Sequence, residues 1–478
     1  MVPARPRLYA SFQNGQTWSI ALTLGFAIWL SRVFLLGHGY GTDADAWRAM
    51  LAAQHLLDTG HYLPSRPPGY PLPEYFDAFM LRIGLGSAFW IGLSSSILSG
   101  LSAALLFRLC GPLGSVRALL ATLALSFTPE VYVAGLGAMD YLWGLTFFLG
   151  ASLCAFSGRV WRTALLLGLA AASRPTYALG FIPLALILIE FDLKRLTQLD
   201  VWKKLVTLGL VSGGITLAFF VPVIMEIGER VIKVPESEGS RLQLVIYNST
   251  LSLFGVAGFF AVAVAIVLAW RHRAQGVTLS ARQSRQLDGW AWTLVVLYGL
   301  LFVRLPDEGS YLMPALLGLY WLLARYAPLK MLWGLAVTLA LSCFLLRLGH
   351  DVHHARTLLL GGPVAHELAL QHERRCVASV VKQRLAESPD GLDYVVTAEY
   401  RPQLLVEIGP PLASRVLYTV RPAKDQSGQL VDTEGVPMAK GARLILLDRA
   451  TVQQADAWGV PDGLMTKLDS YKACPPTP

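Results

Sequence analysis

The sequence predicts a polytopic α-helical membrane protein with a small soluble α/β domain at its carboxyl end. Hydrophobic residues make up 54% of the 478 residues and charged residues only 15%, against about 25% charged in ordinary soluble proteins. The apolar residues are concentrated in runs of roughly twenty, the length that crosses a bilayer as a helix. From about Gly349 onward the composition becomes charged, and helix-like and β-branched segments alternate.

The apolar runs predict about eleven membrane crossings. They are expected at residues 18–37, 87–107, 119–133, 141–156, 163–172, 177–189, 205–227, 245–270, 289–303, 311–323 and 331–346. The fifth and sixth are halves of one apolar stretch that is interrupted at Arg174-Pro175. Proline removes a backbone donor and disfavours helix in the residue before it, so two short helices joined by a break are expected there.

The basic residues predict how these helices are oriented. Most of them lie in short segments beside the apolar runs: Arg5 and Arg7; Arg108 and Arg117; Arg159 and Arg162; Lys194, Arg195, Lys203 and Lys204; Arg271, Arg273, Arg282 and Arg285; Arg325 and Lys330. By the positive-inside rule these segments and the amino terminus are cytoplasmic. An odd number of crossings then puts the carboxyl-terminal domain outside the inner (cytoplasmic) membrane. The net charge of +8 is thereby accounted for without a nucleic-acid partner.

The expected boundary divides a transmembrane module, residues 1–348, from an extracytoplasmic α/β domain, residues 349–478. That domain should contain a charged helix over residues 366–386 and strands at 394–397, 416–420 and 444–447. Cys376 and Cys474 both lie in it and could pair if it faces an oxidising compartment. The three neighbouring histidines His350, His353 and His354 lack a clear fourth ligand, so a polar junction is favoured over a metal site.

The first outer loop, residues 38–84, is too long for a simple connection. It opens with the sequence GTDADAW (residues 41–47), continues as an amphipathic helix to about Thr59, and then contains a proline-rich stretch at residues 62–73. A helix of this kind lies along the membrane surface rather than across it. The loop therefore has the character of a functional segment.

Asp43 and Asp45 are the candidate catalytic groups of this loop. A carboxylate here could accept a proton from an attacking hydroxyl as a general base. The pair could instead hold a divalent cation through oxygen ligands. The structural alternative is that one of them caps the following helix, which is more expected of Asp45 than of Asp43.

The order of these elements resembles the first outer loop of the GT-C superfamily. These are membrane glycosyltransferases that use polyprenyl-phosphate-linked sugars, among them the lipid A aminoarabinose transferases and the protein O-mannosyltransferases. The matching positions are Asp43, the helix that follows it, the run Gly60 to Pro64 (GHYLP) and the Arg66-Pro67-Pro68 element.

Three segments further along the chain are also similar to that superfamily. They are the outer hairpin tip with Asp140, the break at Arg174-Pro175, and the sequence VRLPDEGSYLMPAL at residues 303–316. In the last of these Ser310 stands where the superfamily often has a second arginine, which leaves Arg304 as the expected cation.

The resemblance implies an inverting hexosyl- or pentosyltransferase that moves a sugar from a polyprenyl phosphate to an acceptor on the outer membrane face. Asp43 would be the base of a single displacement. Arginines stay charged and contact phosphate in bidentate fashion, so Arg66, Arg174, Arg241 and Arg304 are the candidate phosphate ligands. The candidate substrate contacts are Asp45, Glu74, Asp140, Tyr70 and Tyr311. Arg32, inside the first crossing, is expected to face the cavity.

Each of these residues also has a structural alternative. Arg66 and Arg241 could be solvated, Arg304 could anchor a helix end, Asp140 could cap a helix and Glu74 could end a turn. Tyr62, Tyr70 and Tyr75 could be interfacial aromatics.

No metal or cofactor is expected, because a cation at Asp43 and Asp45 is not favoured. The expected partners are the bilayer, the lipid-linked sugar, and an acceptor that is a glycolipid, a polysaccharide or a protein.

Two other functions compete with the glycosyltransferase. Transporters also use broken helices and intramembrane arginines, but they usually consist of repeated halves, which this sequence does not show. A non-catalytic scaffold of envelope enzymes would need neither an acidic outer loop nor an Arg-Pro-Pro element.

Overall fold

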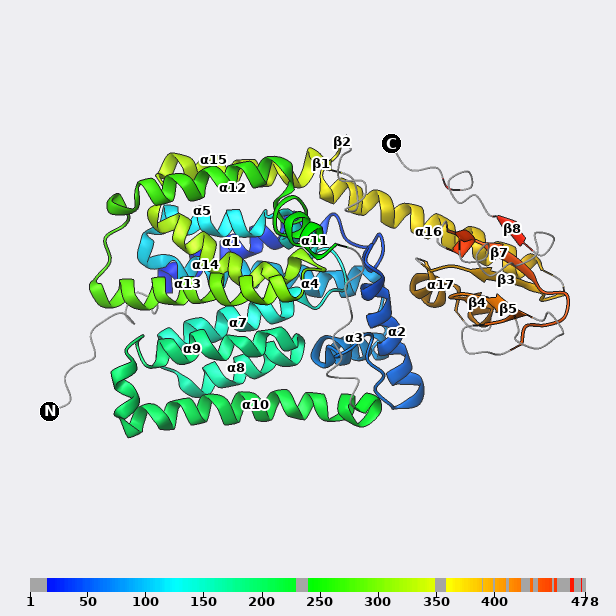
Figure 1. Ribbon diagram of the computed structural model, residues 1–478, viewed down its shortest axis with the longest axis horizontal. Helices are drawn as coiled ribbons and strands as arrows, with labels where there is room; N and C mark the ends of the chain where they lie inside the picture. Colours follow the sequence, from blue (N-terminus) through cyan, green and yellow to red (C-terminus); the bar gives the residue numbers. More distant parts are fainter. Residues whose placement is uncertain are drawn as a thin grey trace.

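The computed structural model describes residues 15–228, 240–348, 358–388, 390–398, 400–409, 412–422, 430–432, 437–448, 451–453, 465–467 and 474. A bundle of roughly aligned helices makes up most of it (Figure 1). The bundle helices are α1 (Gly15–Val33), α4 (Ala88–Leu109), α5 (Ser115–Ser126), α7 (Tyr141–Phe156), α8 (Val160–Ser173), α9 (Phe181–Leu188), α10 (Leu199–Ile227), α12 (Leu253–Arg271), α13 (Ala281–Arg304), α14 (Met313–Tyr326) and α15 (Leu329–Phe344). A helix lies at every predicted crossing, while the number of crossings stays a prediction.

Four helical segments of the described chain are long and apolar enough to cross a membrane unaided. They are Ala88–Leu109, Leu199–Ile227, Arg241–Arg271 and Ala281–Arg304. α10 leaves Leu210, Leu217 and Met225 exposed on the outside of the bundle. Apolar surface of this kind is unfavourable in water and normal in contact with lipid. The predicted membrane class is therefore confirmed.

Two of the predicted crossings are interrupted. The run 119–133 was expected to be one helix, but α5 ends at Ser126 and a short α6 (Pro129–Val133) follows. Pro129 explains the difference, because it puts Thr128 in an extended conformation (φ −63°, ψ 123°). The run 245–270 is divided into α11 (Arg241–Tyr247), a wider turn at Asn248–Ser252 and α12. Gly255, with φ 67°, kinks the start of α12.

The predicted break at Arg174 is confirmed. α8 ends at Ser173, Arg174 is extended (φ −154°, ψ 115°), and a 3-10 turn, η2 (Pro175–Gly180), leads into α9. The Arg174 side chain lies inside the protein with only 2% of its surface exposed. The break therefore presents a buried guanidinium between α8 and α9.

The basic loops meet at one end of the bundle, as predicted. Arg117 donates to the carbonyl of Ala324 at 2.6 Å, which joins the α4–α5 and α14–α15 connections. Arg195 and Arg282 both pair with Glu190 at 2.5 Å, which joins the α9–α10 and α12–α13 connections. We call this the basic end.

The opposite end carries the first outer loop, and we call it the α2 end. α2 (Ala44–Thr59) runs across the ends of the bundle helices, with α3 (Pro71–Arg82) beside it (Figure 1). Both helices are amphipathic, and α2 buries Trp47 and Met50 beneath it. Gly60 ends α2 in the left-handed conformation (φ 74°), which glycine adopts without strain. The predicted helix after Asp43 is found, while its place along the membrane surface stays a prediction.

An α/β unit lies beyond the α2 end (Figure 1). It contains α16 (Pro363–Glu387), β3 (Asp393–Val396), α17 (Arg401–Ile408), β4 (Val416–Leu417), β7 (Arg443–Leu446) and β8 (Met465–Lys467). The strands form a parallel sheet in the order β4-β3-β7-β8. Two antiparallel pairs are also present: β1 (Leu346–Leu348) with β2 (Leu358–Leu360), and β5 (Arg421–Pro422) with β6 (Leu430–Val431). The predicted helix and strands are found, although the strand at 416 is shorter than expected.

The core of this unit is small. Val381 from α16, Leu404 from α17 and Ile445 from β7 are buried in one cluster. The boundary at residue 348 stays a prediction, and His350, His353 and His354 lie outside the described residues.

Cys376 and Cys474 form a disulfide across a sequence separation of 98 residues, so the predicted pairing is confirmed. Because it closes a long loop, replacing both cysteines by serine is expected to destabilise the α/β unit by about 2–5 kcal/mol. Hydrogen exchange of α16 and the sheet in the intact protein measures this effect. Cys154→Ser, at a free cysteine of α7, is the matched control, and equal exchange in both variants would contradict the expectation.

Candidate active site

Charged side chains from distant segments meet at the α2 end. They come from the start of α2, the proline-rich loop, the beginning of α7, the break after α8, and the segment before the 3-10 turn η7 (Gly309–Leu312). The residues are Asp43, Asp45, Arg66, Asp140, Arg174 and Glu308. All but Glu308 were predicted as site residues from the sequence.

Asp140 joins Arg66, which is partly buried, to the buried Arg174. Its Oδ1 accepts from Arg66 Nη2 at 2.9 Å and its Oδ2 accepts from Arg174 Nη1 at 2.9 Å. Arg66 Nε also pairs with Asp45 at 2.9 Å, and Arg174 Nη2 pairs with Glu308 at 3.3 Å. Asp140 occupies the N-cap position of α7 but makes no capping bond with its side chain. The carboxylate therefore organises the cations instead of capping the helix.

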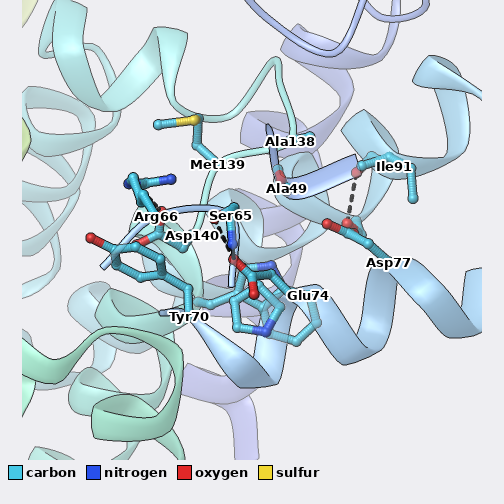
Figure 2. Close-up of a pocket in the computed structure, with 14 residues that line it drawn as sticks. Ala49, Ser65, Arg66, Tyr70, Glu74, Asp77, Ile91, Ala138, Met139 and Asp140 are labelled. Carbon is cyan, nitrogen blue, oxygen red and sulfur yellow. Dashed lines mark hydrogen bonds and ion pairs between the residues drawn. The ribbon is translucent and has the colours of Figure 1, made fainter. Parts of the chain in front are cut away.

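Aromatic rings complete the surroundings of both guanidinium groups. Arg66 lies 4.0 Å from the centre of the Tyr70 ring (Figure 2). Arg174 lies 4.1 Å from the Tyr141 ring and 4.6 Å from the Tyr311 ring. Stacking of this kind suits the weakly hydrated, planar guanidinium better than an ammonium group. We call Arg66 and Arg174 the arginine cluster. Both predicted tyrosines, Tyr70 and Tyr311, contact it.

Glu74 holds the proline-rich loop in place. Its carboxylate is only 1% exposed and accepts from the Ser65 backbone N–H at 3.2 Å and from the Ser65 hydroxyl (Figure 2). It also accepts from the Tyr62 hydroxyl. Burial raises the pKa of Glu74. Tyr62 and Tyr70 are also buried, so they are not interfacial aromatics. A contact between Glu74 and the donor sugar stays a prediction.

Asp43 is the N-cap of α2. Its backbone is extended (φ −72°, ψ 131°) and its Oδ1 accepts from the Asp45 N–H at 2.8 Å. The expectation that Asp45 is the capping residue is therefore wrong. Asp45 already lies in the first helical turn, where its side chain pairs with Arg66 and Arg48.

A cavity of about 300 Å³ opens beside Asp43. The described residues that line it are Gly41, Thr42, Asp43, Glu130, Val133, Ala134, Gly137, Met139, Tyr141, Asn248, Ser252, Asp307, Glu308, Gly309 and Glu367. Five of them are carboxylic acids, and the arginine cluster borders this lining through Tyr141 and Glu308. The cavity therefore has an acidic lining that borders one buried and one partly buried cation.

The two carboxylates that face each other in this cavity differ in protonation behaviour. Although solvent still reaches Asp43, the surrounding protein raises its pKa to about 7, and the negative charges of Asp45 and Glu308 add to the shift. The pKa of Glu308 is lowered instead. Burial acts to raise it, but Arg174, Arg66 and hydrogen bonds from Tyr141 and Ser310 outweigh burial. Asp43 is thus the group suited to exchange a proton near neutral pH.

Two of the predicted phosphate ligands lie outside this cluster. Arg241, at the start of α11, donates to the carbonyls of Val303 at 3.1 Å and Arg304 at 2.6 Å, so it caps the end of α13. Arg304 is the exposed last residue of α13. Neither is among the described residues that line the cavity, and a phosphate contact by either stays a prediction.

The expectation that Arg32 faces the cavity is wrong. Its side chain is fully buried and donates to the carbonyl of Ser126 at 2.7 Å and that of Ile28 at 3.0 Å, above the Tyr132 ring. Ser126 ends α5, where carbonyl groups lack partners within the helix. Arg32 therefore stabilises the end of α5.

Sequence reasoning missed Glu308, Tyr141, Glu130 and Glu367. Glu308 lies in the segment 303–316, in which the resemblance to the superfamily pointed to Arg304 instead. In the structure Glu308 accepts a hydrogen bond from the Ser310 hydroxyl. Glu367 belongs to the predicted charged helix of the α/β domain, and nothing in its sequence neighbourhood points to the first outer loop.

The predicted pair Asp43 and Asp45 gains a third acid in the structure. One oxygen each of Asp43, Asp45 and Glu308 lies within 4.8 Å of the others, a set that a hard divalent cation could use. Asp45 and Glu308 are, however, already paired with Arg66 and Arg174. Catalysis without a metal therefore stays our prediction.

Comparison with known proteins identifies the fold. No family model matches the chain, and no curated protein matches it in sequence. Among solved structures it is similar to ArnT from Cupriavidus metallidurans bound to undecaprenyl phosphate, with a TM-score of 0.52 and 13% identity over 93% of this chain and 88% of that one. The apo form of ArnT matches with a TM-score of 0.52, 12% identity and coverages of 92% and 87%.

The apo oligosaccharyltransferase of Archaeoglobus fulgidus matches less well, with a TM-score of 0.44 and 11% identity over 84% of this chain and 64% of that chain. The chain therefore shares the fold of ArnT, in agreement with the resemblance to the GT-C superfamily that the sequence motifs indicated.

Proposed function

We propose that this protein is an inverting glycosyltransferase that moves a sugar from a polyprenyl phosphate to an acceptor hydroxyl. One observation carries the proposal: Asp43, with its raised pKa, lies on a cavity bordered by the Asp140-bridged pair Arg66 and Arg174. A base and cations close to the leaving phosphate are the groups that such a displacement needs. The fold and the undecaprenyl phosphate bound to ArnT support the donor class.

The chemistry follows from these positions. The acceptor oxygen attacks the anomeric carbon and gives its proton to the Asp43 carboxylate. The bond between that carbon and the phosphate oxygen breaks, and its electron pair leaves with the polyprenyl phosphate. Because attack and departure occur on opposite faces, the anomeric configuration inverts.

The arginine cluster suits the leaving phosphate. Arg66 uses Nε and Nη2 in its ion pairs, and Arg174 uses Nη1 and Nη2. Within the described structure the buried Nε of Arg174 has no hydrogen-bond partner. A buried donor of this kind is costly unless an acceptor arrives. We infer that a phosphate oxygen of the donor supplies that acceptor, and that Tyr70 and Tyr311 keep the guanidinium planes fixed.

The membrane placement is part of the proposal. The basic end would face the cytoplasm of the inner membrane, and the α2 end, with the α/β unit, the other side. The donor head group would then enter the cavity from the outer leaflet. The acceptor, a glycolipid, a polysaccharide or a protein, would approach past the α/β unit.

A transfer assay tests the proposal. The purified protein in nanodiscs is given polyprenyl phosphates carrying labelled sugars, together with envelope extracts separated into lipid, polysaccharide and protein fractions. Label is expected in one of the acceptor fractions, and adding a chelator is expected to leave the rate unchanged. If no donor is consumed with any fraction, a transporter or a scaffold becomes the better explanation.

The pH dependence of transfer provides a separate prediction. Asp43 must be ionised to accept a proton, so kcat/KM is expected to rise as the pH increases through about 7 and then to level off. Burial is the main cause of the raised pKa of Asp43, and the negative charge of Asp45 is the second. Asp45→Asn removes that charge and should move the rising limb to lower pH. Measured profiles with the same limb in both proteins would show that another group titrates.

A further inference from the structure

Among the described residues that line the cavity, one belongs to the α/β unit. Glu367, on the first turns of α16, is 8% exposed and is among the residues that line the cavity. Its Oε1 accepts from the backbone N–H of Thr42 at 2.8 Å, and its Oε2 accepts from the Thr42 hydroxyl. Gln371, one turn further along α16, donates to Glu367 Oε1 at 2.7 Å and so fixes the direction of the carboxylate. Thr42 is the residue immediately before Asp43.

The short segment before Asp43 has no regular structure, so its position depends on contacts from outside. Three hydrogen bonds hold its backbone in place. The Tyr40 carbonyl accepts from the Ala138 N–H at 2.6 Å, and the Gly41 carbonyl accepts from the indole of Trp47 at 2.8 Å. The third is the bond from the Thr42 N–H to Glu367.

These bonds come from different parts of the molecule. The first comes from the outer hairpin and the second from α2 itself, whereas the third comes from α16. The backbone also approaches the hairpin too closely for a larger residue, because a side chain at Gly137 would lie 2.5 Å from the Tyr40 carbonyl. The segment is thus enclosed between the hairpin tip and α16.

We propose that Glu367 is a positioning residue that sets the catalytic base, so that the α/β unit is a working part of the active site. This inference rests on the proposed function, in which Asp43 accepts the acceptor proton. Glu367 holds the amide of Thr42, and that amide sets the direction in which the chain enters α2. Without this contact the Asp43 carboxylate loses its fixed distance from the arginine cluster, and small displacements of a base slow proton transfer strongly.

The test compares variants of the full-length protein in nanodiscs. Glu367→Ala is expected to lower kcat by about 10- to 100-fold while leaving the KM for the donor lipid near its original value, because the arginines are untouched. Glu367→Gln should restore most of kcat, since its amide oxygen can still accept from the Thr42 N–H. Glu387→Ala, at an exposed glutamate near the end of the same helix, is the matched control.

Hydrogen exchange separates this inference from the proposed function. Glu367→Ala should speed exchange at the amide of Thr42, whereas Glu387→Ala should not, and this result does not depend on any substrate. Unchanged exchange in Glu367→Ala would overturn the inference even if the enzyme is active. Equal losses of kcat in the Ala and Gln variants would also overturn it, because charge and not the hydrogen bond would then matter. If Glu367→Ala speeds exchange at Thr42 but the parent protein transfers no sugar, the proposed function is refuted and the positioning contact of Glu367 stands.

Discussion

Asp43→Asn is expected to reduce sugar transfer by about 10²–10⁴-fold, the usual contribution of a positioned general base. The amide cannot accept the proton of the attacking hydroxyl at neutral pH. The fold should survive, because asparagine is as good an N-cap as aspartate and can still accept from the Asp45 N–H. Donor binding should be nearly unchanged, since Asp43 makes no ion pair with Arg66 or Arg174 among the described contacts.

Rates and donor affinities of the variant and the parent protein are measured side by side in nanodiscs. Asp58→Asn provides the control, because Asp58 is an exposed carboxylate on the same helix and accepts a hydrogen bond from Gln54, away from the cavity lining. Full activity in Asp43→Asn would remove Asp43 from the mechanism. Loss of donor binding with it would move Asp43 from the base to the donor site.

Arg174→Ala is expected to have the second largest effect, through both stability and catalysis. The guanidinium is the partner of two carboxylates, Asp140 and Glu308, and is almost fully buried. Removing one partner of a buried ion pair typically costs about 3–5 kcal/mol, because the remaining charge is left without compensation. Loss of a cation at the leaving phosphate should lower transfer by roughly 10²–10³-fold.

Thermal unfolding and donor affinity are measured together for this variant. Arg174→Lys restores the charge but cannot reach both carboxylates in the plane of a guanidinium, so only partial recovery is expected. Arg82→Ala removes an exposed arginine from the end of α3 and is the control. If Arg174→Ala is destabilised but keeps its donor affinity, Arg174 is structural and the phosphate contact belongs to Arg66 or to the arginines at the end of α13.

The sequence was informative about the fold wherever the physics is local. Runs of apolar residues require helices, since the bilayer offers no partners for backbone groups. Proline marked the break at Arg174, and basic residues marked the end of the bundle to which Arg195 and Arg282 belong. A proline, Pro129, also causes the interruption at Thr128, so the sequence carries a local signal for this break as well.

The candidate site was predictable only in part. Asp43, Arg66, Asp140 and Arg174 could be singled out because each is a charged residue in an unusual local setting: a long acidic loop, a proline pair, a hairpin tip and a helix break. The ion pairs of Asp140 with Arg66 and Arg174 depend on how α7 and α8 pack against the first outer loop, and no sequence pattern encodes that packing.

The failures have the same origin. Arg32 was expected in the cavity because a buried arginine needs polar partners, and here backbone carbonyls at the end of α5 meet that need. Glu367 was missed because its partner, Thr42, is 325 residues away in the sequence. Contacts of this range are fixed by the folded chain as a whole.

The release of the lipid carrier tests the central claim most directly. Mass spectrometry of nanodisc lipids after a single incubation counts polyprenyl phosphate released and sugar joined to acceptor in the same sample. We predict one carrier released for each sugar transferred, and both counts lower by about 10²–10⁴-fold with Asp43→Asn. Sugar-loaded donor that stays intact with the parent protein, in the presence of every acceptor fraction, would contradict the assignment of this cavity as a glycosyltransferase site.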